Sequence, residues 1–156
     1  MLPKIGLTES QLNKAATILT TVLADEMLLY IKTRKYHWNV SGESFMELHQ
    51  LFEAQYTELE KLIDEVAERI NKLGSQTIGS MQEFIAQSRL KDDVKYPAQK
   101  AMLKNLLDDH EALIVYLRKD VDVVTEKIKD VVTADFLTGL MEKHETIAWK
   151  LRRYLK

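Results

Sequence analysis

Residues 35–53 contain side chains that could hold a metal ion. His37 and His49 stand on either side of a break that contains Gly42, and the carboxylate Glu53 follows His49 by about one helical turn. Imidazole nitrogens combined with carboxylate oxygens suit Fe, Mn or Zn, and open positions on such a site suit non-haem iron chemistry. The alternative is that two polar residues happen to lie near a turn. Because the chain has no cysteine, any metal would have to be held by His and carboxylate groups.

A band of polar side chains continues along the helix expected after this break. At about 100° per residue, the band covers an arc of roughly 100° beside the apolar stripe of the helix, not opposite it. It consists of His49, Glu53, Glu60, Asp64 and Glu68. For the carboxylates alone, a solvated helix face is the more common explanation. The histidines favour a metal site, because His37 falls on the inward stripe of the preceding helix.

The length of this helix limits how such a site could be built. His49 and Asp64 are fifteen residues apart, or about 22 Å at 1.5 Å per residue, so they cannot hold the same ion from one helix. Either the two halves of the band are separate features, or two copies of the chain share a site. Antiparallel packing of two copies about a two-fold axis near residues 58 and 59 would bring the halves together in two equivalent sites.

The elements that would position these residues are helices. Only five Gly and two Pro interrupt the chain, which leaves few turns for strands and predicts an all-α fold. The first helix is expected to begin at Thr8, where TESQ has the form of a capping box with Gln11, and to end at the break over 39–43. A second capping box, Ser44 with Glu47, is expected to open the next helix.

The second half of the chain completes a bundle. Gly74 is expected to end the second helix, and a short helix is expected over 81–86 in the connection that follows. A third long helix is expected to begin near Pro97, in its first turn, and to run to about Ile128, and the last to begin near Thr133. Four long helices that each carry an apolar stripe predict a four-helix bundle.

Two further histidines fall outside the polar band. A ferritin-type di-iron site inside a bundle needs Glu-x-x-His pairs on two helices. The chain has no such pair at His110 or His144, and both residues lie on apolar stripes. We therefore expect them to be core or interface histidines, and we do not expect a di-iron site inside the bundle.

Composition restricts the class of protein. With 156 residues the chain is expected to be a single domain, residues 1–156. Its 22 Lys and Arg against 24 Asp and Glu give no basic surplus of the kind that nucleic-acid binding normally needs. No apolar run approaches the ~18 residues of a membrane span, and the first residues lack the pattern of a secretory signal. A cytoplasmic protein without a membrane partner is expected.

Two stretches of the sequence resemble one family. YHWNVSGESFMELHQLFEAQYTELEKLIDEVAERI (residues 36–70) and TADFLTGLMEKHETIAWKLR (residues 133–152) resemble the Dps family, the DNA-binding proteins from starved cells, also called mini-ferritins. The resemblance extends over essentially the whole chain. It implies a ferritin-like four-helix bundle with an extra short helix between the second and third helices, assembled from two-fold dimers into a hollow homododecamer.

The resemblance also implies a site and a reaction. A ferroxidase centre would lie at the dimer interface, with Trp38 beside it, and would oxidise Fe(II) to Fe(III), preferentially with hydrogen peroxide, for storage as a ferric mineral. Zn²⁺ could occupy the same centre in vitro. The implied ligands are His37, His49 and Glu53 from one subunit with Asp64 and Glu68 from its mate.

The chain departs from the family pattern at two places. Position 53 is Glu where many members have Asp, so the arm of this ligand is longer by one methylene. At the expected iron-entry pore, Asp135 matches an acidic family position, whereas Val131 and Val132 replace residues that are acidic in some relatives. Asp130 is a candidate to compensate for them.

Two other functions compete with iron oxidation. One is DNA compaction with protection by physical shielding, but the residues before Thr8 contain only Lys4, and the basic C-terminal RRYLK is placed where cations suit a helix dipole. Direct DNA binding is therefore not expected. The other is a purely structural helical shell with an inactive metal site, which the intact ligand set does not favour.

Overall fold

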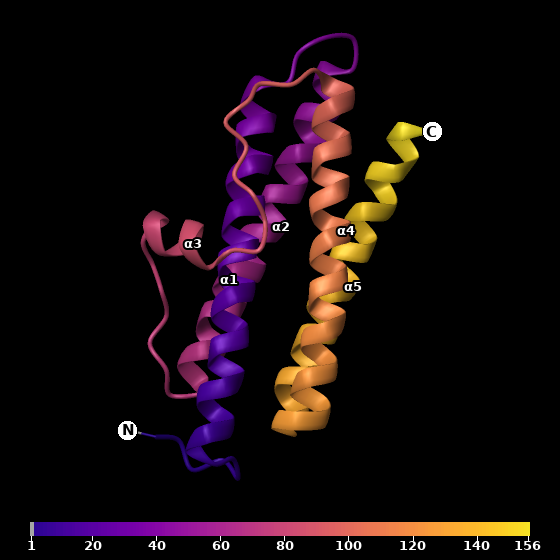
Figure 1. Ribbon diagram of the computed structural model, residues 1–156. Coiled ribbons are helices and arrows are strands. Elements are labelled where there is room, and N and C mark those ends of the chain that lie inside the picture. The colour runs from indigo at the N-terminus through magenta and orange to yellow at the C-terminus, as the bar shows by residue number, and fades with distance from the viewer. Residues whose placement is uncertain (1) are drawn as a thin grey trace.

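Four long helices and one short helix make up most of the structure, a computed structural model that describes residues 2–156. Figure 1 shows α1 and α2 as an antiparallel pair beside α4 and α5, with α3 outside the bundle. The helices are α1 (Glu9–Asn39), α2 (Phe45–Lys72), α3 (Met81–Gln87), α4 (Gln99–Val123) and α5 (Val131–Leu155), and α4 continues into a π-helical turn, η1 (Val124–Ile128). No strand occurs within residues 2–156. The predicted all-α four-helix bundle with an extra short helix between its second and third long helices is confirmed.

The ends of the first two helices largely follow the predicted local chemistry. Thr8 and Gln11 form the predicted capping box at the start of α1, in which the Gln11 amide N–H donates to the Thr8 hydroxyl at 3.3 Å. Gly74, with a φ of +83°, follows the end of α2. Its N–H donates to the Asn71 carbonyl at 2.9 Å, and the next N–H donates to the Ile70 carbonyl at 3.3 Å. Left-handed glycine therefore ends α2 in a Schellman arrangement.

The start of α2 differs from the prediction. Ser44 is the N-cap residue, but its side chain makes no capping hydrogen bond, so the predicted box with Glu47 is wrong. Ser44 has φ −95° and ψ 28° instead of the extended backbone that aims an N-cap oxygen at the first turn. A missed capping box instead opens α3, between Ser80 and Glu83.

The starts of α4 and α5 also differ slightly from the prediction. Helix α4 begins at Gln99 after an extended N-cap at Ala98, so Pro97 precedes the helix and is not in its first turn. Helix α5 begins at Val131, two residues before Thr133, because Asp130 acts as N-cap and accepts from the Thr133 N–H at 3.2 Å.

The core lies between the four long helices. The apolar stripes expected from the sequence supply most of it, and the largest completely buried side chains include Leu12, Leu19 and Leu23 from α1, Leu48, Phe52, Leu59 and Ile70 from α2, and Leu106 and Leu113 from α4. The most extensive helix contacts join α1 to α2 and α4 to α5. Over residues 2–156, the structure contains no helix with both the length and the apolar character needed to cross a bilayer.

Candidate metal centre

His37 and His49 face each other where α1 ends and α2 begins. Their rings stack with centroids 3.8 Å apart and an interplanar angle of 21°. The chain reverses between them through Gly42, whose φ is +112°. A Cβ at this position would lie 3.2 Å from the Gln99 side-chain nitrogen, so both the backbone angle and the space favour glycine. The break seen in the sequence therefore brings the two imidazoles together.

Two reciprocal hydrogen bonds place a proton on Nδ1 of both rings. His37 Nδ1 lies 2.8 Å from the His49 carbonyl oxygen, and His49 Nδ1 lies 3.0 Å from the His37 carbonyl oxygen. Because a carbonyl oxygen only accepts, each Nδ1 must carry a proton and donate. A neutral imidazole of this tautomer has its lone pair on Nε2, which is the arrangement of most metal-binding histidines. Each ring is therefore prepared to offer Nε2 as a ligand.

Aromatic side chains hold the histidine pair in place. The Tyr56 ring meets His37 edge to face at 5.1 Å, and the Phe45 ring lies 5.2 Å from His49. The Arg34 guanidinium lies over Tyr56 at 4.4 Å and over Trp38 at 5.5 Å. His37 is 8% exposed, whereas Trp38 is 65% exposed. One side of the pair is thus packed, and a large exposed aromatic ring lies beside it.

The predicted carboxylate ligands lie on the same helix but do not join the histidines within one chain. Glu53, Asp64 and Glu68 are all exposed, and Glu68 pairs with Lys72 at 3.0 Å. Within residues 2–156, no three His, Asp or Glu side chains come close enough together to hold a metal ion. A single chain therefore assembles the two imidazoles and leaves the three carboxylates exposed on the surface of α2, with Glu68 in an ion pair with Lys72.

Asp64 lines a hollow in the surface. It has a volume of about 530 Å³ between α1 and α2. Met27, Ile63 and Ala67 give it an apolar lining, and Glu60 and Lys61 line it together with Asp64. Tyr30 also lines the hollow, and its ring contacts that of Tyr56. An apolar hollow next to an exposed carboxylate is a surface that another chain could fill.

The two residues predicted for the iron-entry pore have different environments. Asp130 is 3% exposed, caps α5 and pairs with Arg69 at 3.2 Å. Its carboxylate also accepts from the Thr133 hydroxyl, so both oxygens serve the fold. Asp135 is exposed one turn later in α5. Asp130 is therefore engaged by the fold within one chain, and Asp135 is the exposed one of the two residues predicted for the pore.

The remaining histidines form a buried polar cluster in the bundle. His110 and His144 are completely buried, as the sequence analysis predicted, with their Nδ1 atoms 2.9 Å apart. His144 Nε2 lies 2.7 Å from a carboxylate oxygen of the equally buried Glu26. Burial, together with the charge of His144, lowers the pKa of His110 well below its ordinary value. Glu26 was not predicted from the sequence, where its only signal is a charged residue at a position that faces the apolar stripes of other helices.

Known proteins share this fold and much of this sequence. The family model described as the ferritin-like domain matches residues 16–156. A low temperature-induced protein of Nostoc sp. is 47% identical over 153 residues, which are 97% of this chain and 86% of that protein. DNA protection during starvation protein 2 of Bacillus anthracis is 33% identical, and the match covers 88% of this chain and 94% of that protein.

Solved structures agree with these matches. The crystal structure of the Dps protein of Vibrio cholerae, described as a member of the superfamily of ferritin-like diiron-carboxylate proteins, matches with a TM-score of 0.93 and 31% identity. The match covers 99% of this chain and 97% of that chain.

Proposed function

This chain belongs to the Dps family of mini-ferritins, and we propose that it oxidises Fe(II) with hydrogen peroxide and stores the ferric product in a hollow homododecamer. Family membership supports iron storage and protection in general terms. The preference for peroxide, the shared centres and the dodecamer are the specific parts of the proposal.

The observation that carries the proposal is the His37/His49 pair. The reciprocal Nδ1–H bonds to backbone carbonyls give both rings the tautomer that a metal ligand requires. A structural histidine pair would not need both Nε2 atoms free of partners, and no hydrogen bond to either atom occurs within residues 2–156. We infer that the two Nε2 atoms are the nitrogen ligands of the centre, with Glu53 as the carboxylate from the same subunit.

The rest of the centre would come from a second subunit. His49 and Asp64 lie about 22 Å apart along α2, so an ion bound at His49 needs its Asp64 and Glu68 from another copy. Two features of the surface support an isologous dimer here: the hollow beside Asp64, and exposed apolar side chains near the histidines, including Trp38 (65% exposed) and Met46 (59% exposed). A two-fold axis pairs each half of the site with its complement.

The proposed chemistry follows from this ligand set. Two Fe(II) ions each give one electron to hydrogen peroxide, the O–O bond breaks, and both oxygens are reduced to the level of water. Carboxylate oxygens are hard ligands and favour Fe(III) over Fe(II), which adds to the driving force. Pairwise transfer of the two electrons avoids the one-electron cleavage that releases hydroxyl radical.

The test uses paired substitutions in the assembled protein. We expect His37→Ala with His49→Ala to leave the particle mass by light scattering unchanged and to abolish the fast phase of peroxide-driven Fe(II) oxidation. Asp122→Asn, which changes an exposed carboxylate on α4, is the matched control and should oxidise iron at the wild-type rate. Wild-type kinetics in the double-histidine variant would refute the proposal. Zn²⁺, which has no redox chemistry, should compete with Fe(II) in the same assay.

Direct DNA binding is not part of the proposal. In the C-terminal RRYLK, Arg152 pairs with Glu111 of α4 at 2.6 Å, so it is not a free cation. The expectation that DNA is not bound directly remains a prediction, which a gel shift at low salt would test.

A further inference from the structure

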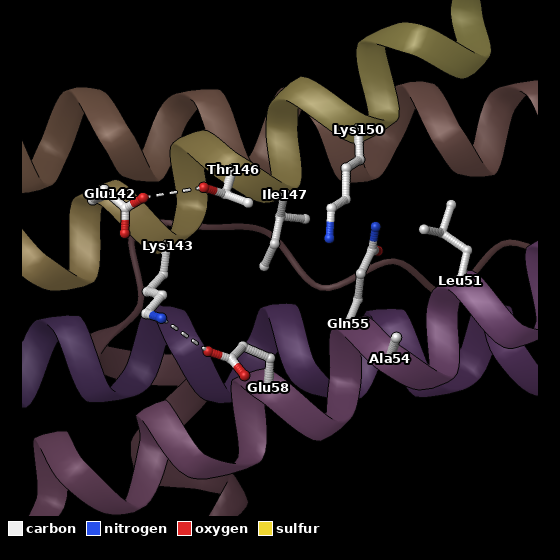
Figure 2. Close-up of a pocket in the computed structure, with 9 residues that line it drawn as sticks. All are labelled: Leu51, Ala54, Gln55, Glu58, Glu142, Lys143, Thr146, Ile147 and Lys150. Atoms are coloured by element: carbon white, nitrogen blue, oxygen red, sulfur yellow. Dashed lines mark hydrogen bonds and ion pairs between the residues drawn. The ribbon is translucent and has the colours of Figure 1, made fainter.

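A groove of about 390 Å³ opens between α2 and α5 and contains none of the proposed iron ligands. Figure 2 shows side chains of both helices converging on it, with Gln55 and Glu58 from α2 opposite Lys143, Thr146 and Lys150 from α5. Apolar side chains line the remaining wall. The groove therefore combines a fixed shape with several polar groups, as binding sites for small molecules do.

Gln55 is the unusual residue of this groove. It is 4% exposed, yet neither its amide nitrogen nor its amide oxygen has a hydrogen-bond partner within residues 2–156. Buried polar atoms in native proteins nearly always have partners, because leaving one unpaired costs free energy. A glutamine whose amide is buried at the edge of a groove therefore indicates a partner that enters from outside the chain.

The charges of the groove are unevenly paired. Lys143 pairs with Glu58 at 3.7 Å, and Glu142 accepts from the Thr146 hydroxyl at 3.3 Å. Lys150 has no ion pair within the part of the chain that the structure describes. Figure 2 shows its ammonium directed toward the amide nitrogen of Gln55 across the groove. Lys150 thus lies near the Gln55 amide, and neither group has a hydrogen-bond partner within residues 2–156.

We propose that this end of the groove binds a small inorganic oxyanion of the phosphate class, held between Lys150 Nζ and Gln55 Nε2. A tetrahedral oxyanion offers acceptors to both donors at once and compensates the unpaired ammonium. The amide, fixed by burial, sets the position of the ion, and the flexible lysine closes over it. Glu58 and Glu142 at the other end of the groove repel a second negative group, which limits the ligand to one small anion. This site goes beyond the proposed iron chemistry and does not depend on it.

The test titrates iron-free protein with inorganic phosphate, with sulfate and chloride as parallel arms, by isothermal titration calorimetry. Losing a hydrogen bond to a charged group weakens binding roughly tenfold or more. We expect that loss in Lys150→Gln and in Gln55→Leu. Lys119→Gln, which removes an exposed lysine of α4, should keep its affinity within about twofold, since unspecific surface charge contributes little at moderate salt.

Thermal unfolding separates a binding role of Gln55 from a purely structural one. Phosphate should raise the Tm of wild type and of Lys119→Gln but not that of Gln55→Leu. Without phosphate, Gln55→Leu should be as stable as wild type or more stable, because it removes two buried atoms that lack partners.

Four results would overturn the proposal: no saturable phosphate binding by wild type, equal losses in Lys119→Gln and Lys150→Gln, chloride binding as strong as phosphate binding, or a Gln55→Leu protein that loses stability and still binds phosphate. The last would mean that a rotated Gln55 amide accepts directly from Lys150. All of these measurements use iron-free protein, so they stand whether or not the ferroxidase proposal holds.

Discussion

The imidazoles of His37 and His49 are each oriented by the backbone of the other residue. His37 Nδ1 donates to the His49 carbonyl at 2.8 Å, and His49 Nδ1 donates to the His37 carbonyl at 3.0 Å. Because the acceptors are main-chain atoms, the tautomers depend on the fold of the α1–α2 corner and not on a further side chain. The site is therefore organised before any metal binds, which lowers the cost of ordering its ligands.

A mixing experiment tests whether the centre is shared between subunits. One variant carries His37→Ala and His49→Ala, the other Asp64→Asn and Glu68→Gln, and each alone should lack fast Fe(II) oxidation. In a mixed dimer, one of the two centres combines the intact histidines of one subunit with the intact carboxylates of the other. Random mixing by coexpression should therefore restore about a quarter of the wild-type rate, since half of the dimers are mixed and each has one complete centre.

The control for mixing is each variant coexpressed with itself at the same total concentration. No recovery in the mixed particles, with heterodimers verified by mass spectrometry, would mean that all ligands act within one subunit. Because each variant alone is inactive, recovery well above a quarter would mean that the two variants form mixed dimers more often than random pairing does.

Glu53 is expected to tolerate shortening but not removal. Glu53→Asp keeps the carboxylate and should hold the oxidation rate within about threefold of wild type, whereas Glu53→Ala removes a hard oxygen ligand and should slow it roughly tenfold or more. Stopped-flow measurement of Fe(III) formation at fixed peroxide distinguishes the two. Since Glu53 is exposed in the single chain, neither change should alter the thermal stability of the free subunit by more than about 0.5 kcal/mol. Equal rates in wild type and Glu53→Ala would exclude Glu53 as a ligand.

The sequence predicted the fold better than it predicted local boundaries. The stripe of Leu12, Leu19 and Leu23 identifies α1 because its spacing must match the helical period, and a bundle follows from four such stripes. Ser44 had the right residue type for a capping box but not the right backbone angles, which the tight corner after Gly42 determines. Capping chemistry that depends on a tertiary corner is not visible in a local motif.

The candidate site was predictable only in part for a similar reason. The types and spacing of His37 and His49 pointed to a metal, but the reciprocal carbonyl bonds depend on how the corner folds back. Glu26 and Gln55 escaped prediction because single polar residues on buried faces have no periodic pattern of their own. Glu26 is partnered by His144 of α5, 118 residues away in sequence, and Lys150, which Figure 2 shows beside Gln55, also belongs to α5.

The buried His110 makes stability depend on pH. Burial and the neighbouring charge of His144 depress its pKa in the folded protein, whereas the unfolded chain has a value of about 6.5. Below about pH 6.5 the unfolded state therefore binds more protons than the folded state does. The stability of the folded protein that depends on a neutral His110 is fully present above that pH and is lost as the pH falls. Between the unfolded value and the depressed pKa of the folded state, the free energy of unfolding falls by up to about 1.4 kcal/mol per pH unit.

Replacing His110 with Gln should remove this pH dependence. His110→Gln keeps a neutral hydrogen-bonding group toward His144 Nδ1. The quantity to compare is the slope of the free energy of unfolding against pH, not the absolute stability. Between pH 7 and pH 5, urea unfolding of wild type should lose more free energy than that of His110→Gln. Parallel pH profiles would show that His110 is not the group responsible.

Substitutions at Asp130 and Asp135 should distinguish a structural role from a role in iron entry. Asp130→Ala removes the N-cap of α5 and leaves Arg69, whose side chain is 14% exposed, without its ion-pair partner. Losing a cap costs about 1 kcal/mol, and leaving a largely buried charge unpaired raises the total to about 3 kcal/mol. Asp135→Asn changes an exposed residue and should leave stability within about 0.5 kcal/mol of wild type.

If Asp135 lines an entry pore, however, Asp135→Asn should slow iron oxidation at low Fe(II), where entry limits the rate, and not at high Fe(II). Asp130→Asn is the matched variant, because an asparagine oxygen can still cap Thr133 while the charge is lost. Slower entry in Asp130→Asn with unchanged entry in Asp135→Asn would reverse the assignment of the pore residue.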